Sequence, residues 1–567
     1  MRFAIVTDTH IRSPKGDLSS PYPVNEKANA RAEYAVGMIA ATNPAFTVHL
    51  GDVIHPLPHM PSAPDAIDEA RRILKPLNPN LYFVPGNHDI GDKPSKLMPA
   101  GPVEKSGIEA YESLIGPQYQ TFSYEDLQIF CINSSLINTG SEIEQQQRTW
   151  LEKELGDSRA TVKILFSHYP PFVYNDKEAD HYDNYAQPGR NWLLSLAAES
   201  GVNAIFSGHV HHFFYNRWQG IPLYCLPATS FTRQDYAELF PVSPANEYGR
   251  DDEGKFGITL VEVNMGAVSI SIHNTYGRQG EYTGKPPGPP DTNSVIPHLR
   301  HTWHVPKALP YNGPMEEFGR KEARNDYPLL RLMQLGIKTV RVPGTDLLDH
   351  LAKARIADWL ALDRKAVLFF TPNSMQSVLQ ACEDLNRGDN ECIKAMEVLI
   401  RLSDKPEESI NEISKAGSNI PIWLSAITTS ADNPDPNRTF AHTVTSGVLP
   451  HQLTALAEMA AAASAQAVVM QVPWESELES TVIQAKASLQ KYSLQLVVNL
   501  CFRKNNPAEA NYDRSAIAER YAQALKIANS YPDLTLQIDT FEDIDRGYGP
   551  RLGFIDRLAN LHEAFQV

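Results

Sequence analysis

Cysteine is scarce in this chain and forms no recognisable pattern. The 567 residues include only five cysteines, and none of them forms a Cys-x-x-Cys pair. Neither a disulfide framework nor a zinc ribbon is therefore indicated. Long apolar runs are also missing, since no stretch approaches the roughly 20 residues that cross a bilayer. No membrane partner is expected. The apolar start, residues 1–6, is too short for a secretory signal, so we expect a cytoplasmic protein.

Basic residues are outnumbered by acidic ones. The chain carries 51 Lys and Arg against 67 Asp and Glu, a formal net charge of −16. A long polyanion such as duplex DNA would be repelled by most of that surface, so no nucleic-acid polymer is expected as a partner. A small anionic substrate stays open, because bound cations can dominate the local field.

The length and the order of the segments predict two α/β domains. Residues 1–276 alternate between strand-like and helix-like patterns. Residues 277–300 include Pro286-Pro-Gly-Pro-Pro290, which is typical of a linker. Residues 301–567 alternate again, which predicts a parallel sheet. We favour a TIM-barrel-like (β/α)8 fold there over an open sheet. The role of this second domain stays open between a substrate-selecting wall, an oligomerisation unit and a second active site. A homo-oligomer is compatible with the sequence.

Five short apolar runs of strand type in the first domain each end in polar side chains. In open α/β sheets the ligand site lies beyond the carboxyl ends of the strands. We therefore expect these side chains to meet in one place if the runs are neighbours. They are Asp8 and His10, Asp52, Asn87 with His88 and Asp89, His168, and His209 with His211.

These side chains offer nitrogen and oxygen donors without thiolate, which suits Mn, Fe, Zn or Co better than copper(I) or a structural zinc. Seven of them, all but His88 and Asp89, are candidate metal ligands, and seven donors exceed the needs of one tetrahedral ion. With one bridging carboxylate they suit two ions about 3.5–4 Å apart, an arrangement used for phosphoryl chemistry. His88 would supply the proton that the leaving oxygen needs, with Asp89 orienting its ring.

Simpler explanations exist for each feature taken alone. Asp-x-His occurs by chance, and an isolated histidine such as His168 more often packs in a core or loop than binds a metal. Five such coincidences at five strand ends are hard to accept together. For His55 and His212, a surface or packing role is favoured over a direct one. In the second domain, Glu475, Asn499 and Asp539 follow strand candidates, but helix capping explains them more simply.

Taken together, the motifs resemble those of the calcineurin-like metallophosphoesterases over about residues 1–275. The form Gly86-Asn87-His88-Asp89 and the ending Gly208-His209-Val-His211 are most similar to the class III cyclic-nucleotide phosphodiesterase branch. This resemblance implies a four-layer αββα sandwich and a dinuclear centre, with Asp52 bridging the ions and His88 as the catalytic histidine. It implies that the first ion is held by Asp8, His10, Asp52 and His211, and the second by Asp52, Asn87, His168 and His209. The resemblance does not extend to residues 301–567.

The expected function is hydrolysis of a small phosphodiester, a cyclic nucleotide or another organic phosphodiester, by attack of a metal-bridging hydroxide. The expected cofactors are two metal ions, Mn, Fe or Zn before others. One alternative is a phosphomonoesterase, or a hydrolase of a non-phosphate bond, at the same centre. Another is a metal-binding regulatory or scaffold protein.

Overall fold

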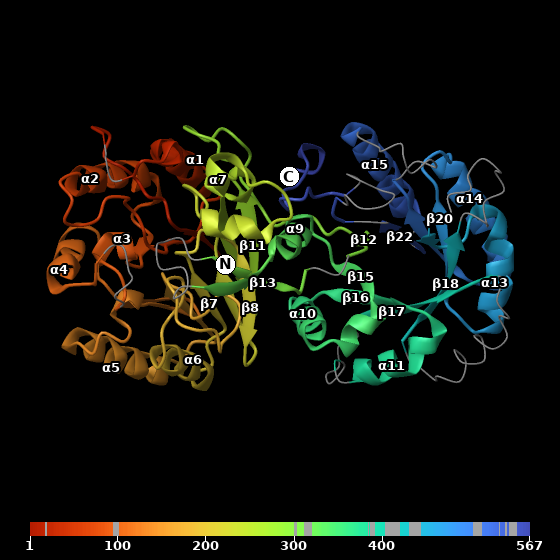
Figure 1. Ribbon diagram of the computed structural model, residues 1–567, viewed down its shortest axis with the longest axis horizontal. Helices are drawn as coiled ribbons and strands as arrows, with labels where there is room; N and C mark the ends of the chain where they lie inside the picture. Colours follow the sequence, from red (N-terminus) through yellow and green to blue (C-terminus); the bar gives the residue numbers. More distant parts are fainter. Residues whose placement is uncertain are drawn as a thin grey trace. The chain divides into compact units, whose positions relative to one another are not determined.

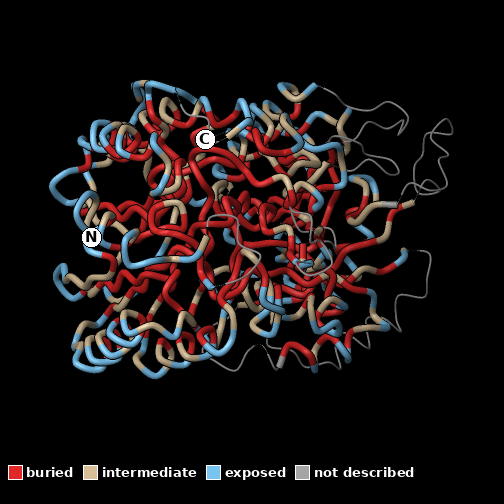
Figure 2. Tube along the Cα trace, turned by 60° about the vertical axis from the view of Figure 1, so that its left-hand side comes forward, coloured by how far each residue is buried: buried red, intermediate tan, exposed pale blue. Residues whose placement is uncertain are grey.

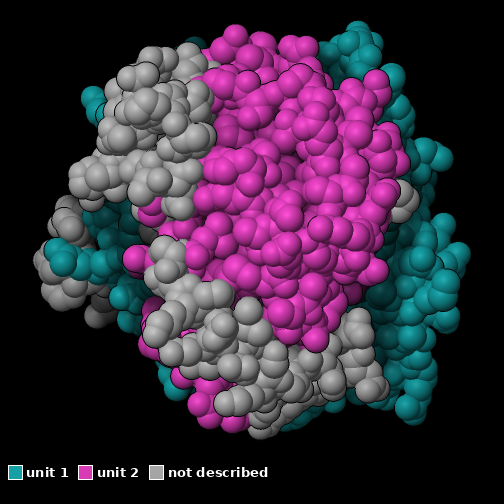
Figure 3. Space-filling view, turned by 90° about the vertical axis from the view of Figure 1, so that its right-hand side faces the viewer, with its two compact units in different colours: residues 1–290, 306–330 teal, residues 291–305, 331–567 magenta. Residues whose placement is uncertain are grey.

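The computed structural model forms two compact units, which Figure 3 colours separately. The first comprises residues 1–290 and 306–330, and the second residues 291–305 and 331–567. Whether independently folding domains divide at residues 276 and 301 stays a prediction. The structure describes residues 1–16, 20–94, 101–299, 303–310, 320–383, 385, 392–402, 420–429, 444–502, 513–531, 533–538, 541–543 and 553–566. No helix among these residues has both the length and the apolar character needed to cross a membrane.

The first unit is built on two mixed sheets. One has the strand order β11-β10-β1-β2-β3, and the other β4-β5-β6-β7-β9-β8. The strands of the first sheet are β1 (Arg2–Val6), β2 (Thr47–His49), β3 (Leu81–Phe83), β10 (Gly257–Asn264) and β11 (Ala267–Asn274). Those of the second are β4 (Gln120–Tyr124), β5 (Leu127–Cys131), β6 (Val162–Ser167), β7 (Ala204–Ser207), β8 (Phe214–Trp218) and β9 (Ile221–Cys225).

Helices cover the outer face of each sheet. Helices α1 (Ala28–Ala41) and α2 (Ala63–Leu74) share one apolar core with β1 and β10. Helices α5 (Glu142–Asp157) and α6 (Gly189–Glu199) share another with β5 to β7. Figure 1 shows the two helix pairs on opposite sides of the unit. In Figure 2, the exposed residues lie mostly on the outer turns of the trace and the buried residues inside it.

The inner faces of the two sheets meet through aromatic side chains. Phe3 of β1 lies edge-to-face with Phe166 of β6, with the ring centroids 6.2 Å apart. Phe166 stacks in turn on Phe206 of β7. The order of layers is thus helix, sheet, sheet, helix, and the predicted αββα sandwich is confirmed.

The strand ends that carry the polar side chains come from both sheets. Strands β1, β2 and β3 are parallel neighbours in one sheet, and β6 and β7 are parallel neighbours in the other. Backbone hydrogen bonds continue beyond the strands, from Asp8 to the carbonyl of Gly51 at 3.1 Å and from Gly208 to that of His168 at 3.0 Å. The segments that follow β1 and β2, and those that follow β6 and β7, are therefore fastened to each other beyond the strands.

The second unit is a closed barrel of parallel strands. Its main sheet runs β12-β22-β21-β20-β18-β17-β16-β15, with β19 (Val444–Ser446) antiparallel beside β18. A bridge between His298 and Arg341, with the Leu299 N–H donating to the Arg341 carbonyl at 3.0 Å, joins β12 to β15 and closes the ring. The TIM-barrel-like prediction is confirmed. The strands are β12 (Ile296–Pro297), β15 (Thr339–Pro343), β16 (Lys365–Phe370), β17 (Ile393–Ile400), β18 (Ile422–Thr429), β20 (Ala467–Val472), β21 (Gln495–Leu500) and β22 (Leu534–Ile538).

Helices lie between the barrel strands, as the alternating pattern predicts. They are α9 (Tyr327–Gln334), α10 (His350–Leu360), α11 (Met375–Glu383), α13 (Leu453–Ala462), α14 (Leu478–Leu489) and α15 (Arg514–Ser530). The apolar barrel interior includes Ile296 from the segment predicted as linker, together with Val367, Trp423 and Val469. The end of that segment is thus part of the barrel wall.

Candidate metal centre

The backbone at the strand ends has an unusual conformation. Five of the seven predicted metal ligands have positive φ angles, between 44° and 66°, and none of the five is glycine. Such left-handed conformations are uncommon for residues with a Cβ and concentrate at functional sites. They turn the side chains of these residues into a common space. The five are Asp8, His10, Asp52, His209 and His211.

Four side chains form a first cluster. His10 Nε2 and His211 Nε2 lie 3.1 Å apart, and each faces a carboxylate oxygen. Asp8 Oδ1 is 3.3 Å from His211 Nε2, and Asp52 Oδ2 is 3.5 Å from His10 Nε2. All four side chains are buried. Their donor atoms converge closely enough for one ion to bind them all.

A second cluster lies on the other side of Asp52. Asn87 Oδ1 is 3.1 Å from His168 Nε2 and 3.0 Å from His209 Nδ1. The other oxygen of Asp52, Oδ1, lies 3.4 Å from His168 Nε2. Asp52 thus turns one oxygen to each cluster. The structure brings together all seven side chains that the sequence singled out, in the two groups that the resemblance implies.

Backbone carbonyls fix the protonation of two of the histidine rings. His168 Nδ1 donates to the carbonyl of Leu50 at 2.7 Å, and His211 Nδ1 to that of Phe231 at 2.8 Å. Because a carbonyl can only accept, Nδ1 carries the proton and Nε2 presents its lone pair to the cluster. Both rings are thereby prepared to bind a cation through Nε2.

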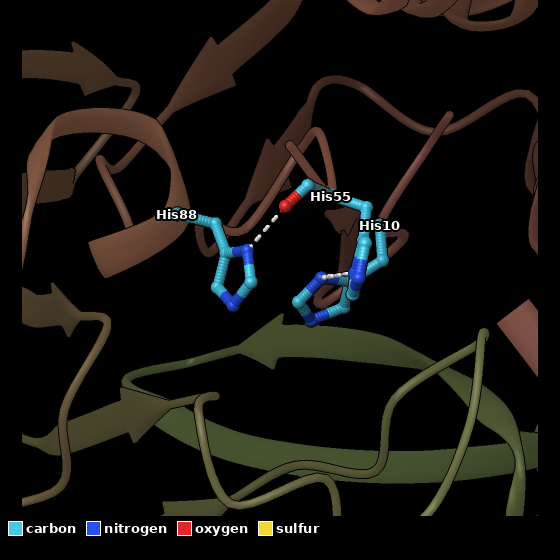
Figure 4. A group of neighbouring side chains, drawn as sticks. All are labelled: His10, His55 and His88. Atoms are coloured by element: carbon cyan, nitrogen blue, oxygen red, sulfur yellow. Dashed lines mark hydrogen bonds between the residues drawn. The ribbon is translucent and has the colours of Figure 1, made fainter. Parts of the chain in front are cut away.

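His88 lies at the edge of the site, beside His10 and His55 (Figure 4). Its Nδ1 donates to the His55 carbonyl at 2.5 Å. Asp89 instead accepts from the backbone N–H groups of Gly86 at 2.8 Å and Val53 at 3.0 Å. We expected Asp89 to orient the His88 ring, but the His55 carbonyl does so instead. The Asp89 carboxylate joins the loop that carries Asp52 to the loop that carries Asn87. His88 is the one predicted site residue that is partly exposed.

The local electrostatics differ from one ionisable side chain to the next. Burial lowers the pKa of His10 and of His209. Burial would also lower the pKa of His168, but the nearby Asp52 carboxylate outweighs it and raises that pKa to about 9. Burial, followed by repulsion from Asp52, raises the pKa of Asp89 to about 7. Burial thus keeps His10 and His209 neutral, whereas Asp52 favours positive charge at His168, where a bound cation would take the place of the Nε2 proton.

The donor set fits the implied metal ions. Asp8 Oδ1 is buried and has no hydrogen-bond partner among the described residues, which is costly for a carboxylate unless a cation completes it. The donors are imidazole, carboxylate and amide groups, and the two groups share one carboxylate. Such a set suits two first-row divalent cations.

The comparison with known proteins agrees with this geometry. Residues 1–213 match the family model described as calcineurin-like phosphoesterase. This stretch belongs to that family. All seven candidate ligands and His88 lie within it, and the calcineurin-like fold implies a dinuclear centre of divalent ions.

Curated relatives of the phosphoesterase domain align with parts of the chain. Serine/threonine-protein phosphatase CPPED1 of Bos taurus is 28% identical over 190 residues, which cover 32% of this chain and 58% of the relative. Glycerophosphodiester phosphodiesterase GpdQ of Enterobacter lignolyticus is 25% identical over 252 residues, 43% and 84% of the two chains. The 3',5'-cyclic adenosine monophosphate phosphodiesterase CpdA of Haemophilus influenzae is 26% identical over 181 residues, which cover 32% of this chain and 61% of the relative. The chain thus spans less than two thirds of the length of CPPED1 and of CpdA.

Sequence reasoning missed three groups behind the ligands of the phosphoesterase domain. One is the His55 carbonyl, which no side-chain pattern reveals. The others are Tyr182 and Asp183, in the loop between β6 and α6, where no periodicity or motif marks them. Of the second-unit candidates, Asn499 donates to the Ser446 carbonyl at 3.0 Å, and Asp539 lies outside the described residues.

Proposed function

We propose that this chain is a metal-dependent phosphoric ester hydrolase that acts on a small phosphodiester. The observation that carries the proposal is Asp52, which turns one carboxylate oxygen to each of two buried donor clusters. We further propose that the ions are Mn, Fe or Zn, held by the seven residues named above. Nitrogen and oxygen donors without thiolate support that choice.

Two cations held there would act as Lewis acids on a phosphoryl oxygen and lower the pKa of a coordinated water. The chain's own residues do the rest. Their buried positions restrict bulk water, and the carbonyls behind His168 and His211 keep the ring lone pairs turned inward. Hydrolysis forms a bond from water oxygen to phosphorus and breaks the bond to the leaving oxygen, which must then take up a proton.

His88 is suited to supply that proton. Its Nδ1 is tied to the His55 carbonyl, so Nε2 is the nitrogen available to an incoming ester (Figure 4). The ring is partly exposed beside the fully buried donors, where a substrate can reach it. A protonated His88 would donate from Nε2 to the leaving oxygen as the ester bond breaks.

Two of the relatives support the choice of a diester. GpdQ and CpdA are named as phosphodiesterases, and the GpdQ alignment covers more of this chain than the CPPED1 alignment. The net charge of −16 argues against a polyanionic partner and is compatible with a small ester. A phosphomonoesterase activity is the second candidate, because CPPED1 is named as a protein phosphatase.

The test is hydrolysis of an aryl phosphodiester and of the matching monoester by the manganese-reconstituted chain. Asp52→Asn should abolish turnover, and Asp65→Asn, the same change at a half-exposed surface aspartate, should leave it intact. Faster turnover of the diester supports the proposal, and faster turnover of the monoester favours the second candidate. If neither ester reacts while two ions are bound, the site acts on another bond or serves regulation.

A further inference from the structure

Two consecutive residues hold ligands of the second cluster from behind. Asn87 Nδ2 donates to the Tyr182 hydroxyl at 3.3 Å, which leaves Oδ1 facing His168 and His209. Asp183 Oδ1 lies 3.6 Å from His209 Nε2. At that distance Asp183 makes no hydrogen bond to the ring, but its charge favours the tautomer with the proton on Nε2, which leaves the Nδ1 lone pair for the cluster. The loop thus sets which atom each of these two ligands presents.

Asp183 belongs to a buried group of four charges. Arg233 and Lys321 both contact the Asp183 carboxylate. Both also contact Asp235, whose Oδ2 lies 2.5 Å from Lys321 Nζ. The exposed fraction of these four side chains is at most 9%. Two cations therefore balance two carboxylates away from water, where an unbalanced charge is costly.

Lys321 reaches this group from a distant part of the chain. It begins β14 (Lys321–Arg324), which pairs with β13 (Pro306–Leu309), and this strap, residues 306–310 and 320–330, belongs to the first unit. It is anchored there by Asp326, which accepts from the Tyr215 N–H at 2.8 Å, and by the Tyr327 hydroxyl, 3.0 Å from His212 Nδ1. The strap lies beyond the family match, which ends at residue 213.

We propose that Lys321 is a positioning residue for the second metal site, so that the strap completes the phosphoesterase centre. This rests on the proposed function. Without the Lys321 ammonium, Arg233 alone faces two carboxylates. Asp183 is then held by Arg233 and by the Tyr236 hydroxyl, which donates to Oδ2 at 2.9 Å, so its position beside His209 is less firmly fixed. Loss of such an outer partner typically weakens metal affinity about 10- to 100-fold. Among the contacts of the described residues, none joins a ligand of the first cluster directly to the four charges, so the first ion should bind normally.

The experiment is a Mn²⁺ titration of the metal-free full chain, followed by electron paramagnetic resonance, which distinguishes single ions from a coupled pair. Wild type should bind two equivalents and show the coupled signal. Lys321→Met should weaken the second equivalent about 10- to 100-fold and leave the first unchanged. Lys307→Met is the matched control, since Lys307 lies on the same strap but donates to the Leu239 carbonyl at 2.8 Å.

A double variant separates charge balance from packing. Lys321→Met with Asp235→Asn leaves Arg233 to balance Asp183 alone, and it should recover most of the metal affinity of the second site. It also keeps the test decisive if the single variant fails to fold. Unchanged affinity in Lys321→Met, an equal loss at both sites, or no recovery in the double variant would overturn the inference. A wild type that binds no ion at all would instead refute the proposed function.

Discussion

A buried ion pair inside the barrel allows a quantitative test of the second unit. Arg341 of β15 binds Glu397 of β17 through two hydrogen bonds, Nε to Oε2 at 2.7 Å and Nη2 to Oε1 at 2.9 Å. Gln537 of β22 donates to the same carboxylate at 3.0 Å. The Arg341 and Glu397 side chains are at most 3% exposed. Together with Gln537, the pair thus links three strands of the barrel.

Glu397→Gln keeps the size of the side chain but leaves the Arg341 charge uncompensated. Breaking a buried ion pair by removing one partner costs about 3–5 kcal/mol. For a domain of this size each kcal/mol shifts the midpoint of thermal unfolding by about 2–4 °C, so a decrease of about 6–20 °C is expected. Differential scanning calorimetry of the full chain measures it. The transition of the first unit, recognised by its response to added metal, should not move.

The control replaces both partners. Arg341→Met with Glu397→Leu removes the charges together, and such replacements are often neutral or stabilising. The double variant should therefore unfold at a higher temperature than Glu397→Gln. A shift below about 2 °C in the single variant, less than 1 kcal/mol on the same scale, would refute the reasoning, as would a double variant less stable than the single one.

Four further predictions concern pH and the metal centre. Burial disfavours the charged form of Glu397, but Arg341 outweighs burial and lowers the pKa of Glu397. The stability that Glu397 contributes should be complete above the unfolded pKa of about 4.3 and be lost as the pH falls below that value. Urea unfolding of wild type and Glu397→Gln at several pH values measures this. Removal of metal with a chelator should abolish ester hydrolysis and lower the unfolding temperature of the first unit, and added Mn²⁺ should restore both in calorimetry and turnover assays. His88→Ala should lower kcat by about 10²- to 10⁴-fold at unchanged metal content, with a smaller loss for esters of more acidic leaving groups in steady-state kinetics. In Gly208→Ala the new Cβ would lie 2.1 Å from Thr7 Oγ1 and 2.7 Å from Asp8 Oδ2, so the metal affinity measured by titration should fall. The control Gly156→Ala adds a Cβ in open space on α5 and should bind metal normally.

The ligand residues could be predicted because metal sites leave a local trace. Each ligand lies within a few residues of the end of a strand, so strand and donor are read from one short stretch, as with Asp8 after β1 and His168 after β6. The pattern does not say which strands share a sheet. The ligands come from two sheets, and that arrangement depends on packing between Phe3 and Phe166, residues far apart in the sequence.

Other parts left no such trace. Strand β12 has only two residues and follows a Pro- and Gly-rich stretch, so its pairing with β22 and β15 is not visible locally. Strand β17 contains Glu397, whose charge interrupts the apolar pattern because it pairs with Arg341 inside the barrel. The strap strand β14 is polar in sequence, and only its contacts with distant residues of the first unit make it a strand of that unit.

The most direct test of the account is anomalous X-ray diffraction from crystals of the Mn²⁺-loaded chain, measured at the manganese absorption edge. A dinuclear centre predicts two peaks, one among Asp8, His10 and His211 and the other among Asn87, His168 and His209, with Asp52 contacting both. A single peak that Asp52→Asn leaves unchanged, or peaks away from these side chains, would contradict it.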